Sequence, residues 1–218
     1  ARVIEELPDS IGRYQFTHVL VQEILATNLS AARRSRLPRE IGEALEDAYA
    51  HNLAVHAAEL AHHFARVEAG DIDEKFVWYS LMAGEQALAG YAFEDALTHF
   101  QRGLAAKEGK PPDEENADIL FGMGRAQVAM LQMDEAMGSL TAAFDYFTNA
   151  GKIRRALVVA EHPLPVYAGR FRWASQLSAQ TVELVPADSH DVGRLLSNHV
   201  RLVGFQKADY AGVVTAFE

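Results

Sequence analysis

The sequence predicts an all-α protein in which helices pack in consecutive pairs along the chain, preceded by one short β-hairpin. Three observations favour this fold. Apolar residues recur at helical spacing from Thr17 onward. No convincing strand pattern follows residue 17. A block of residues then recurs at an offset of 40, and such a period is typical of helical repeat proteins. The 218 residues, 49% of them hydrophobic, are enough to bury a sizeable core.

Composition excludes several functional classes. The chain has no cysteine, so disulfides, thiolate catalysis, cysteine zinc sites and iron–sulfur clusters are excluded. No apolar run approaches the ~20 residues that span a bilayer, and no secretory h-region stands at the N-terminus. We therefore expect a cytoplasmic protein without membrane contacts. The net charge of −10 disfavours nonspecific nucleic-acid binding.

The charge is unevenly distributed. Residues 1–70 carry −3, residues 71–150 carry −9 and residues 151–218 carry +2. This pattern suits either a solvated acidic face or a surface whose two ends attract different partners.

The N-terminal run predicts a β-hairpin. Two β-prone segments, 3–7 and 13–16, flank a stretch with Pro8 and Gly12. Because an isolated hairpin is marginal in water, we expect it to belong to a domain upstream. Residues 209–218 begin an amphipathic pattern without a stop signal, so we also expect the chain to be a piece of a larger protein.

Local signals indicate where the helices begin. Thr17 and Ser30 can serve as N-caps, and Pro38 suits the first turn of a helix over 38–50. A second helix is predicted over 53–69, where residues at helical spacing form one stripe. Asp71 and Glu74 resemble a capping box before the next helix, and Pro111-Pro112-Asp113 marks a loop followed by a new N-cap.

The repeat is the most informative feature. Residues 93–100 align with 133–140, and the same offset maps Gly84 onto Gly124 and Gly103 onto Ala143. A weaker copy falls at 171–174, and a fourth near 210–217. Small residues at fixed positions let two antiparallel helices approach closely, and a large side chain then fills the space toward the next pair.

This pattern resembles the tetratricopeptide repeat. Ala96 would stand at its twentieth position, with Gly84 at the eighth and Phe100 at the twenty-fourth. Ala136, Gly124 and Leu140 repeat that register. The insert over 109–114 departs from the family's period, and the third copy has His162 at the eighth position, beside Pro163 and Pro165. The resemblance implies a right-handed α-solenoid with repeats over 38–70, 72–110, 113–150, 152–187 and 188–218.

A second resemblance covers residues 13–104. The runs 13–25, 31–46 and 58–64 are similar, in that order, to the segment that follows the nucleotide-binding core in bacterial STAND-type signalling ATPases. These include MalT-like and LuxR-type transcriptional regulators and relatives fused to cyclase domains. The resemblance implies that residues 1–37 end a winged-helix domain, with its β-wing and one helix, and that 38–218 form the helical repeat domain.

The repeat register places one set of side chains on the concave face of the array. They would suit a groove for a protein or peptide segment, or they could pack against neighbouring repeats. The set comprises Trp78, Leu81, Glu85, Phe121, Arg125 and Val128, extended weakly by Asn198 and Leu202. A basic surface near the third repeat could select an acidic partner or simply be solvated; it comprises Arg154, Arg155, Arg170 and Arg172.

No motif predicts catalysis or a cofactor. The chain lacks G-x-x-x-x-G-K-[ST] and G-x-S-x-G, so we expect no enzyme activity. Glu59 and His62 have the Glu-x-x-His spacing of di-iron bundles, with His51, His56 and His63 nearby, but no second such motif is present. Packed or half-exposed histidines are therefore the favoured explanation of the cluster. The basic run Arg33, Arg34, Arg36 and Arg39 suits a solvated turn or a contact with an ATPase core.

The sequence thus favours a non-catalytic interaction and sensor arm of a multidomain signal-transduction ATPase, and the resemblance implies that this ATPase is a transcriptional regulator. Its partner would be a protein segment or its own upstream ATPase core, with no direct nucleic-acid contact. Two alternatives remain open: a free-standing scaffold that assembles a complex, and, more remotely, a metal-binding helical protein.

Overall fold

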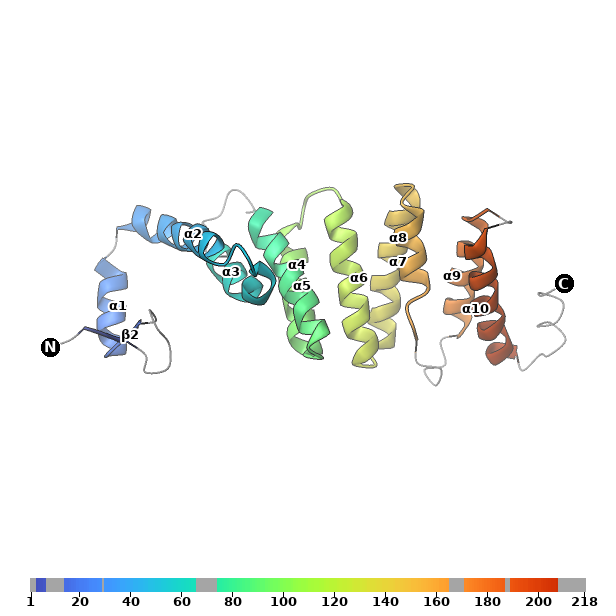
Figure 1. Cartoon of the computed structure of the whole chain (residues 1–218), viewed down its shortest axis with the longest axis horizontal. Helices are drawn as coiled ribbons and strands as arrows, with labels where there is room; N and C mark the ends of the chain where they lie inside the picture. The colour runs from blue at the N-terminus through green and yellow to red at the C-terminus, as the bar shows by residue number, and fades with distance from the viewer. Residues whose placement is uncertain are drawn as a thin grey trace.

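The computed structural model describes residues 3–6, 14–28, 30–65, 74–164, 171–186 and 189–207. In this part of the chain the fold is mainly α, with one small N-terminal sheet, as the sequence predicts. The helices follow one another along the long axis of the molecule (Figure 1). Among the described residues no helix is long and apolar enough to cross a membrane.

The predicted hairpin is present. Strands β1 (Ile4–Glu6) and β2 (Tyr14–Phe16) pair antiparallel, with Ile4 opposite Phe16. The expected turn lies outside the described residues. The helix that follows, α1 (Val19–Asn28), begins after His18, whose Nδ1 accepts a hydrogen bond from the Leu20 amide at 3.3 Å. The predicted cap Thr17 instead donates its amide to the Val3 carbonyl, because it extends the strand pairing.

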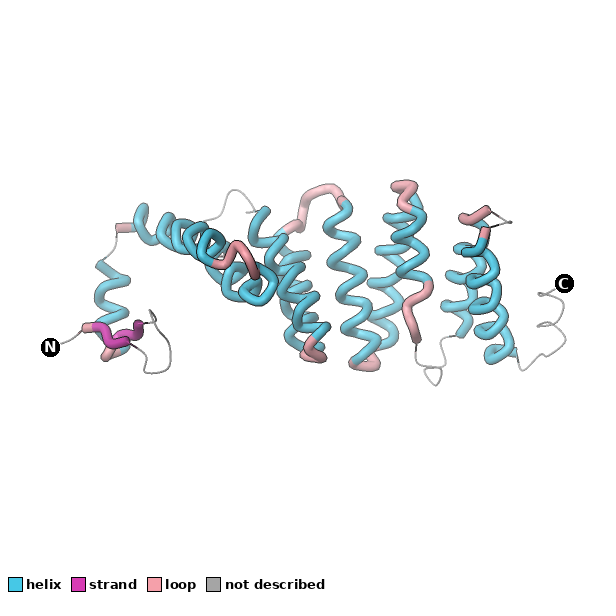
Figure 2. The backbone as a smooth tube through the Cα atoms, in the orientation of Figure 1, coloured by secondary structure: helices cyan, strands magenta, loops and turns pink. Residues whose placement is uncertain are grey.

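The remaining helices pack each on the next, so neighbours in sequence are neighbours in space (Figure 2). They are α2 (Ala31–Ala48), the 3₁₀ turn η1 (Leu53–His56), α3 (Ala57–Phe64), α4 (Glu74–Ala89), α5 (Phe93–Ala106), α6 (Glu114–Ala129), α7 (Met133–Asn149), α8 (Ile153–Ala160), α9 (Phe171–Glu183) and α10 (His190–Lys207).

The helix starts predicted at Ser30 and Asp113 are confirmed, whereas the start predicted at Pro38 is wrong. Ser30 caps α2, with its Oγ accepting from the Arg33 amide at 3.4 Å. Asp113 caps α6 in a capping box with Asn116. Pro38 lies inside α2 and does not begin a helix. The Ser30 cap starts the helix earlier, and the helix continues through the proline although it lacks a backbone N–H.

The segment 53–69, predicted as one helix, begins with two separate elements. Residues 53–56 form a 3₁₀ turn and residues 57–64 an α-helix, so the continuous helix predicted from residue 53 is wrong. Residues 66–73, including the predicted cap Asp71, lie outside the described residues. Glu74 is the first residue of α4.

The close approach predicted at the repeated glycines is confirmed. A Cβ placed on Gly84 would lie 2.5 Å from the Phe100 ring, and one on Gly124 would lie 2.6 Å from Leu140. Both glycines therefore allow the second helix of a pair to press a large side chain onto the backbone of the first. Ala96 and Ala136, the other small repeat positions, are fully buried.

Phe100 also joins one pair to the next. Its ring contacts Gly122 on α6 as closely as it contacts Gly84 on α4, and it is fully buried. The earlier pair α2–α3 uses the same device, since a Cβ on Gly42 would lie 2.8 Å from Phe64. The sequence alignment missed this contact because a longer connection separates Gly42 from Phe64.

Three helix ends share one turn geometry. Tyr91 and Leu131 have φ of 61°, and Gly151 has φ of 69°. In each turn the next amide bonds to the carbonyl five residues earlier, as from Ala92 to Ala87 at 2.9 Å. These are Schellman motifs, which glycine usually closes. Two of the three therefore hold a large side chain in the left-handed region.

The third pair is irregular, as its weaker repeat predicts. Helix α8 has 8 residues, whereas α4 and α6 have 16 each. It ends at Ala160, before His162 and Pro163, because proline disfavours helical conformation at the residue before it. The partner helix α9 begins at Phe171.

Candidate binding groove

A cavity of about 330 Å³ lies across the first helices of three successive pairs, α4, α6 and α8. Four of the eight predicted groove residues line it together. Apolar side chains come one from each helix, and four charged side chains accompany them. The lining comprises Leu81, Glu85, Asp118, Phe121, Arg125, Arg155 and Val158. This cavity is called the groove below.

The charged side chains of the groove are paired between helices. Arg125 on α6 bonds to Glu85 on α4, and Arg155 on α8 bonds to Asp118 on α6. The Arg125 guanidinium also lies 4.8 Å from the centre of the Phe121 ring, a cation–π contact. The two arginines are thus held at the groove by charge and, for Arg125, by an aromatic face.

Ion pairs of this kind connect first helices along the whole array. On α2, Glu46 accepts from Lys75 and, at 2.5 Å, from the buried Tyr79 hydroxyl. Burial raises the pKa of Tyr79 well above its usual value, and the hydrogen bond to Glu46 raises it further. Further contacts join α6 to α8 and α8 to α10: Lys152 to Glu114 at 2.5 Å, and Arg194 to Glu161 at 2.7 Å. We call these contacts the interhelix ion pairs.

Trp78 lies outside the groove, in a neighbouring cavity of about 390 Å³ between α4 and the loop before α6. Its side chain is 42% exposed. The same cavity is lined by Lys107, whose Nζ bonds to Asp113 at 2.7 Å and to Glu115 at 2.6 Å. Burial alone would lower the pKa of Lys107, but these hydrogen bonds outweigh it and raise the pKa.

Lys107 is 7% exposed, so it acts as the anchor of the loop that breaks the repeat period. Sequence reasoning missed it. The signal was a lysine two residues before the 109–114 insert, with a run of acidic residues over 113–115 at the end of the insert.

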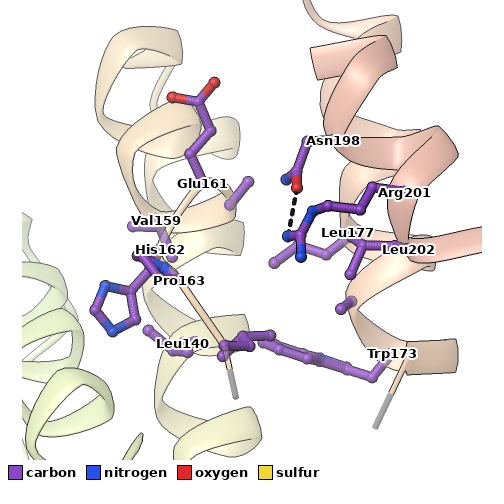
Figure 3. A pocket seen from close by; sticks show the side chains of 13 residues that line it. Leu140, Val159, Glu161, His162, Pro163, Trp173, Leu177, Asn198, Arg201 and Leu202 are labelled. Atoms are coloured by element: carbon purple, nitrogen blue, oxygen red, sulfur yellow. Dashed lines mark hydrogen bonds between the residues drawn. The ribbon is translucent and has the colours of Figure 1, made fainter. Parts of the chain in front are cut away.

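The C-terminal predicted residues lie elsewhere. Asn198 and Leu202, on α10, line a narrow cavity of about 30 Å³ between α8, α9 and α10 (Figure 3). In that view Asn198 bonds to Arg201, at 2.9 Å, on the α10 side of the cavity. Trp173 lies at its lower end, and its Nε1 donates to Thr141 at 2.9 Å.

Val128 is 7% exposed and belongs to the hydrophobic core with Leu140 and Phe144. Its burial removes it from any open groove, which corrects the prediction for this residue. The repeat register places it on a first helix, but near the end of α6 it shares a buried cluster with residues of α7, the second helix of its own pair.

His162 connects the groove to the narrow cavity. Its ring meets the edge of Phe121 at 6.0 Å between centroids, and it also lines the narrow cavity. Burial, together with the nearby positive charge of Arg125, lowers the pKa of His162 to about 4. The imidazole is therefore neutral at neutral pH. The sequence marked His162 only as a departure from the repeat.

The histidine cluster forms no metal site in the described part of the chain, where no group of three potential ligands comes together. His56 stacks on Tyr49 with 3.6 Å between ring centroids, and its Nδ1 lies 3.6 Å from Glu59. His62 and His63 meet edge to face.

The basic run of α2 forms surface ion pairs within the helix. Arg36 bonds to Glu40 at 2.9 Å and Arg39 to Glu43 at 3.1 Å. Such pairs on exposed helices contribute little to stability. On α8, Arg155 is paired in the groove and Arg154 is exposed, whereas the side chains of Arg170 and Arg172 lie outside the described residues.

Comparison with known proteins gives no family: no family model, no curated protein and no solved structure matches this chain.

Proposed function

We propose that this chain is a non-catalytic protein-interaction arm that binds a segment of a partner protein in the groove across α4, α6 and α8. The observation that carries the proposal is the meeting of Leu81, Glu85, Phe121 and Arg125, predicted from repeat register alone, around one open cavity. Clefts that offer apolar contact beside a few oriented polar groups are typical of binding sites.

The finer fold assignment supports this proposal. We infer a tetratricopeptide-like right-handed solenoid, because Gly84 with Phe100 and Gly124 with Leu140 make equivalent contacts in the register of that family. Such arrays bury each pair on the next and leave extended surfaces for partners.

The position of the arm in a larger protein is part of the same proposal. The N-terminal hairpin and α1 suit the end of a winged-helix domain in a STAND-type signalling ATPase, as the second resemblance implies. In a transcriptional regulator of that kind, the segment bound in the groove would change how the arm packs on the ATPase core. This step rests on resemblance and not on fold alone.

A selection experiment tests the groove. A displayed peptide library is panned on the purified chain, and the enriched peptides are measured by calorimetry against two variants. Val158→Asp alters a groove residue that is 54% exposed, and Leu131→Asp alters a turn residue that is 55% exposed. We expect binding to be lost in the first variant and kept in the second.

Because the two positions are equally exposed, the added charge is matched and only the location differs. Peptides that bind both variants equally, or a library that yields no peptide, would contradict the groove as the binding site. Circular dichroism of both variants verifies that neither has lost its helices.

A further inference from the structure

We infer that the groove selects an uncharged, apolar side chain of the partner segment, so that binding depends little on salt. This inference rests on the proposed function, and it specifies the chemistry of the partner at the same site.

The charges of the groove are balanced and already occupied. Its two arginines and two carboxylates form two pairs, Arg125 with Glu85 and Arg155 with Asp118. A charged side chain entering the groove would have to displace one member of a pair or be desolvated without a counter-charge. Either event costs free energy, whereas an apolar side chain requires neither.

Each of the three helices contributes an apolar side chain to the groove. Leu81 on α4, Phe121 on α6 and Val158 on α8 contribute one side chain each. Val158 is 54% exposed, so it offers surface that a partner can remove from water. Burial of such surface is favourable by roughly 25 cal/mol per Å².

The group behind Phe121 also keeps the groove uncharged. His162 contacts the edge of the Phe121 ring. Burial and the charge of Arg125 lower its pKa to about 4, so no additional positive charge adjoins the ring at neutral pH. The lining therefore offers no net charge that would steer a charged partner over distance.

Three capped nine-residue peptides test the inference by calorimetry with the whole chain. Each alternates one side chain of interest with glutamine: leucine in the first, lysine in the second and glutamate in the third. We expect the leucine peptide to bind most tightly, with an affinity that changes less than about threefold between about 50 and 500 mM salt.

The matched variants locate the contact. Val158→Asp should weaken the leucine peptide at least about tenfold, in the range of an interface hot spot. Leu131→Asp, which adds the same charge on a turn, should leave its affinity unchanged. This outcome would support both the groove and its preference for apolar side chains.

Two other outcomes separate the inference from the proposed function. If the lysine or glutamate peptide binds more tightly and loses more than about tenfold at high salt, with Val158→Asp still altering it, the groove stands and the apolar preference is overturned. If no peptide binds, or if Val158→Asp changes nothing, the proposed function itself is overturned.

Discussion

The pairs α4–α5 and α6–α7 are almost copies of each other, whereas the pair α8–α9 is not. In the first two pairs a glycine sits in mid-helix under a large side chain of the second helix, Gly84 under Phe100 and Gly124 under Leu140. In the third pair the corresponding residue is His162, beyond the end of a helix half as long. A narrow cavity then remains between α8, α9 and α10.

The difference shows what one small residue does in this architecture. Without a side chain at that position, the second helix can lie against the first along its length. With an imidazole there and a proline next, the first helix ends early and offers its partner helix a shorter surface to pack on. His162 instead turns toward Phe121 of the preceding pair.

The largest test of the comparison removes the Phe100 ring, which lies against Gly84 of its own pair and Gly122 of the next. Phe100→Ala should destabilise the protein by about 3–5 kcal/mol, because the fully buried ring leaves a cavity between two pairs. Chemical denaturation measures the change. Tyr91→Ala, at a residue 81% exposed on the same helix pair, is the control and should change stability little. Equal effects would mean that the Phe100 contact does not hold the pairs together.

The next test adds a methyl group where the helices touch. Gly84→Ala and Gly124→Ala should each destabilise the protein by about 1–3 kcal/mol, because the new Cβ overlaps Phe100 or Leu140. Gly138→Ala, in the middle of α7 with nothing within 4 Å, should instead stabilise it by about 0.5–1 kcal/mol. The opposite signs are the result to look for; a stabilising Gly84→Ala would refute the close approach.

The third test concerns His162, the residue that distinguishes the irregular pair. Its pKa in the folded protein is lowered from 6.5 to about 4, so the unfolded chain binds this proton more readily. Stability should therefore be full above pH 6.5 and decline as the pH falls toward 4. His162→Gln should reduce that decline between pH 7 and 4, as measured by denaturation at each pH. An unchanged pH dependence in the variant would show that His162 is solvated.

The smallest test concerns the shared turn. Leu131→Gly should stabilise the protein by about 1 kcal/mol, because glycine adopts the φ of 61° without steric cost. Gly151→Ala should have the opposite sign at the equivalent position, where φ is 69°. Thermal unfolding of both variants gives the comparison. If Leu131→Gly is destabilising instead, the leucine makes contacts that outweigh its backbone strain.

The sequence predicted the parts of this fold that depend on spacing. The offset of 40 residues located Gly84, Gly124 and their contacts. A small residue at this helical position allows the same close approach of a large side chain in each pair. The same offset also brought Leu81, Glu85, Phe121 and Arg125 to one place. The prediction for Val128 failed because the repeat register gives the face of a helix and not how deeply a residue near the helix end is buried.

Competing local signals explain the other errors. Pro38 is a good first-turn residue, but Ser30 offers a cap eight residues earlier, and the longer helix buries Gly42 against Phe64. A contact between residues far apart in the sequence left no local trace. The bond between Glu46 and Tyr79 depends on how the chain returns to α2, which no single stretch of sequence specifies.

The interhelix ion pairs form a second set of contacts between the helix pairs, and this set is partly exposed to water. They join α2 to α4, α4 to α6, α6 to α8 and α8 to α10, and many of their atoms are half exposed to water. Screening by salt weakens such pairs, while the buried contacts of Phe100 and Leu140 are unaffected. At high ionic strength the buried contacts should therefore keep the helices packed in the same order, while the ion pairs contribute less to the stability of the array.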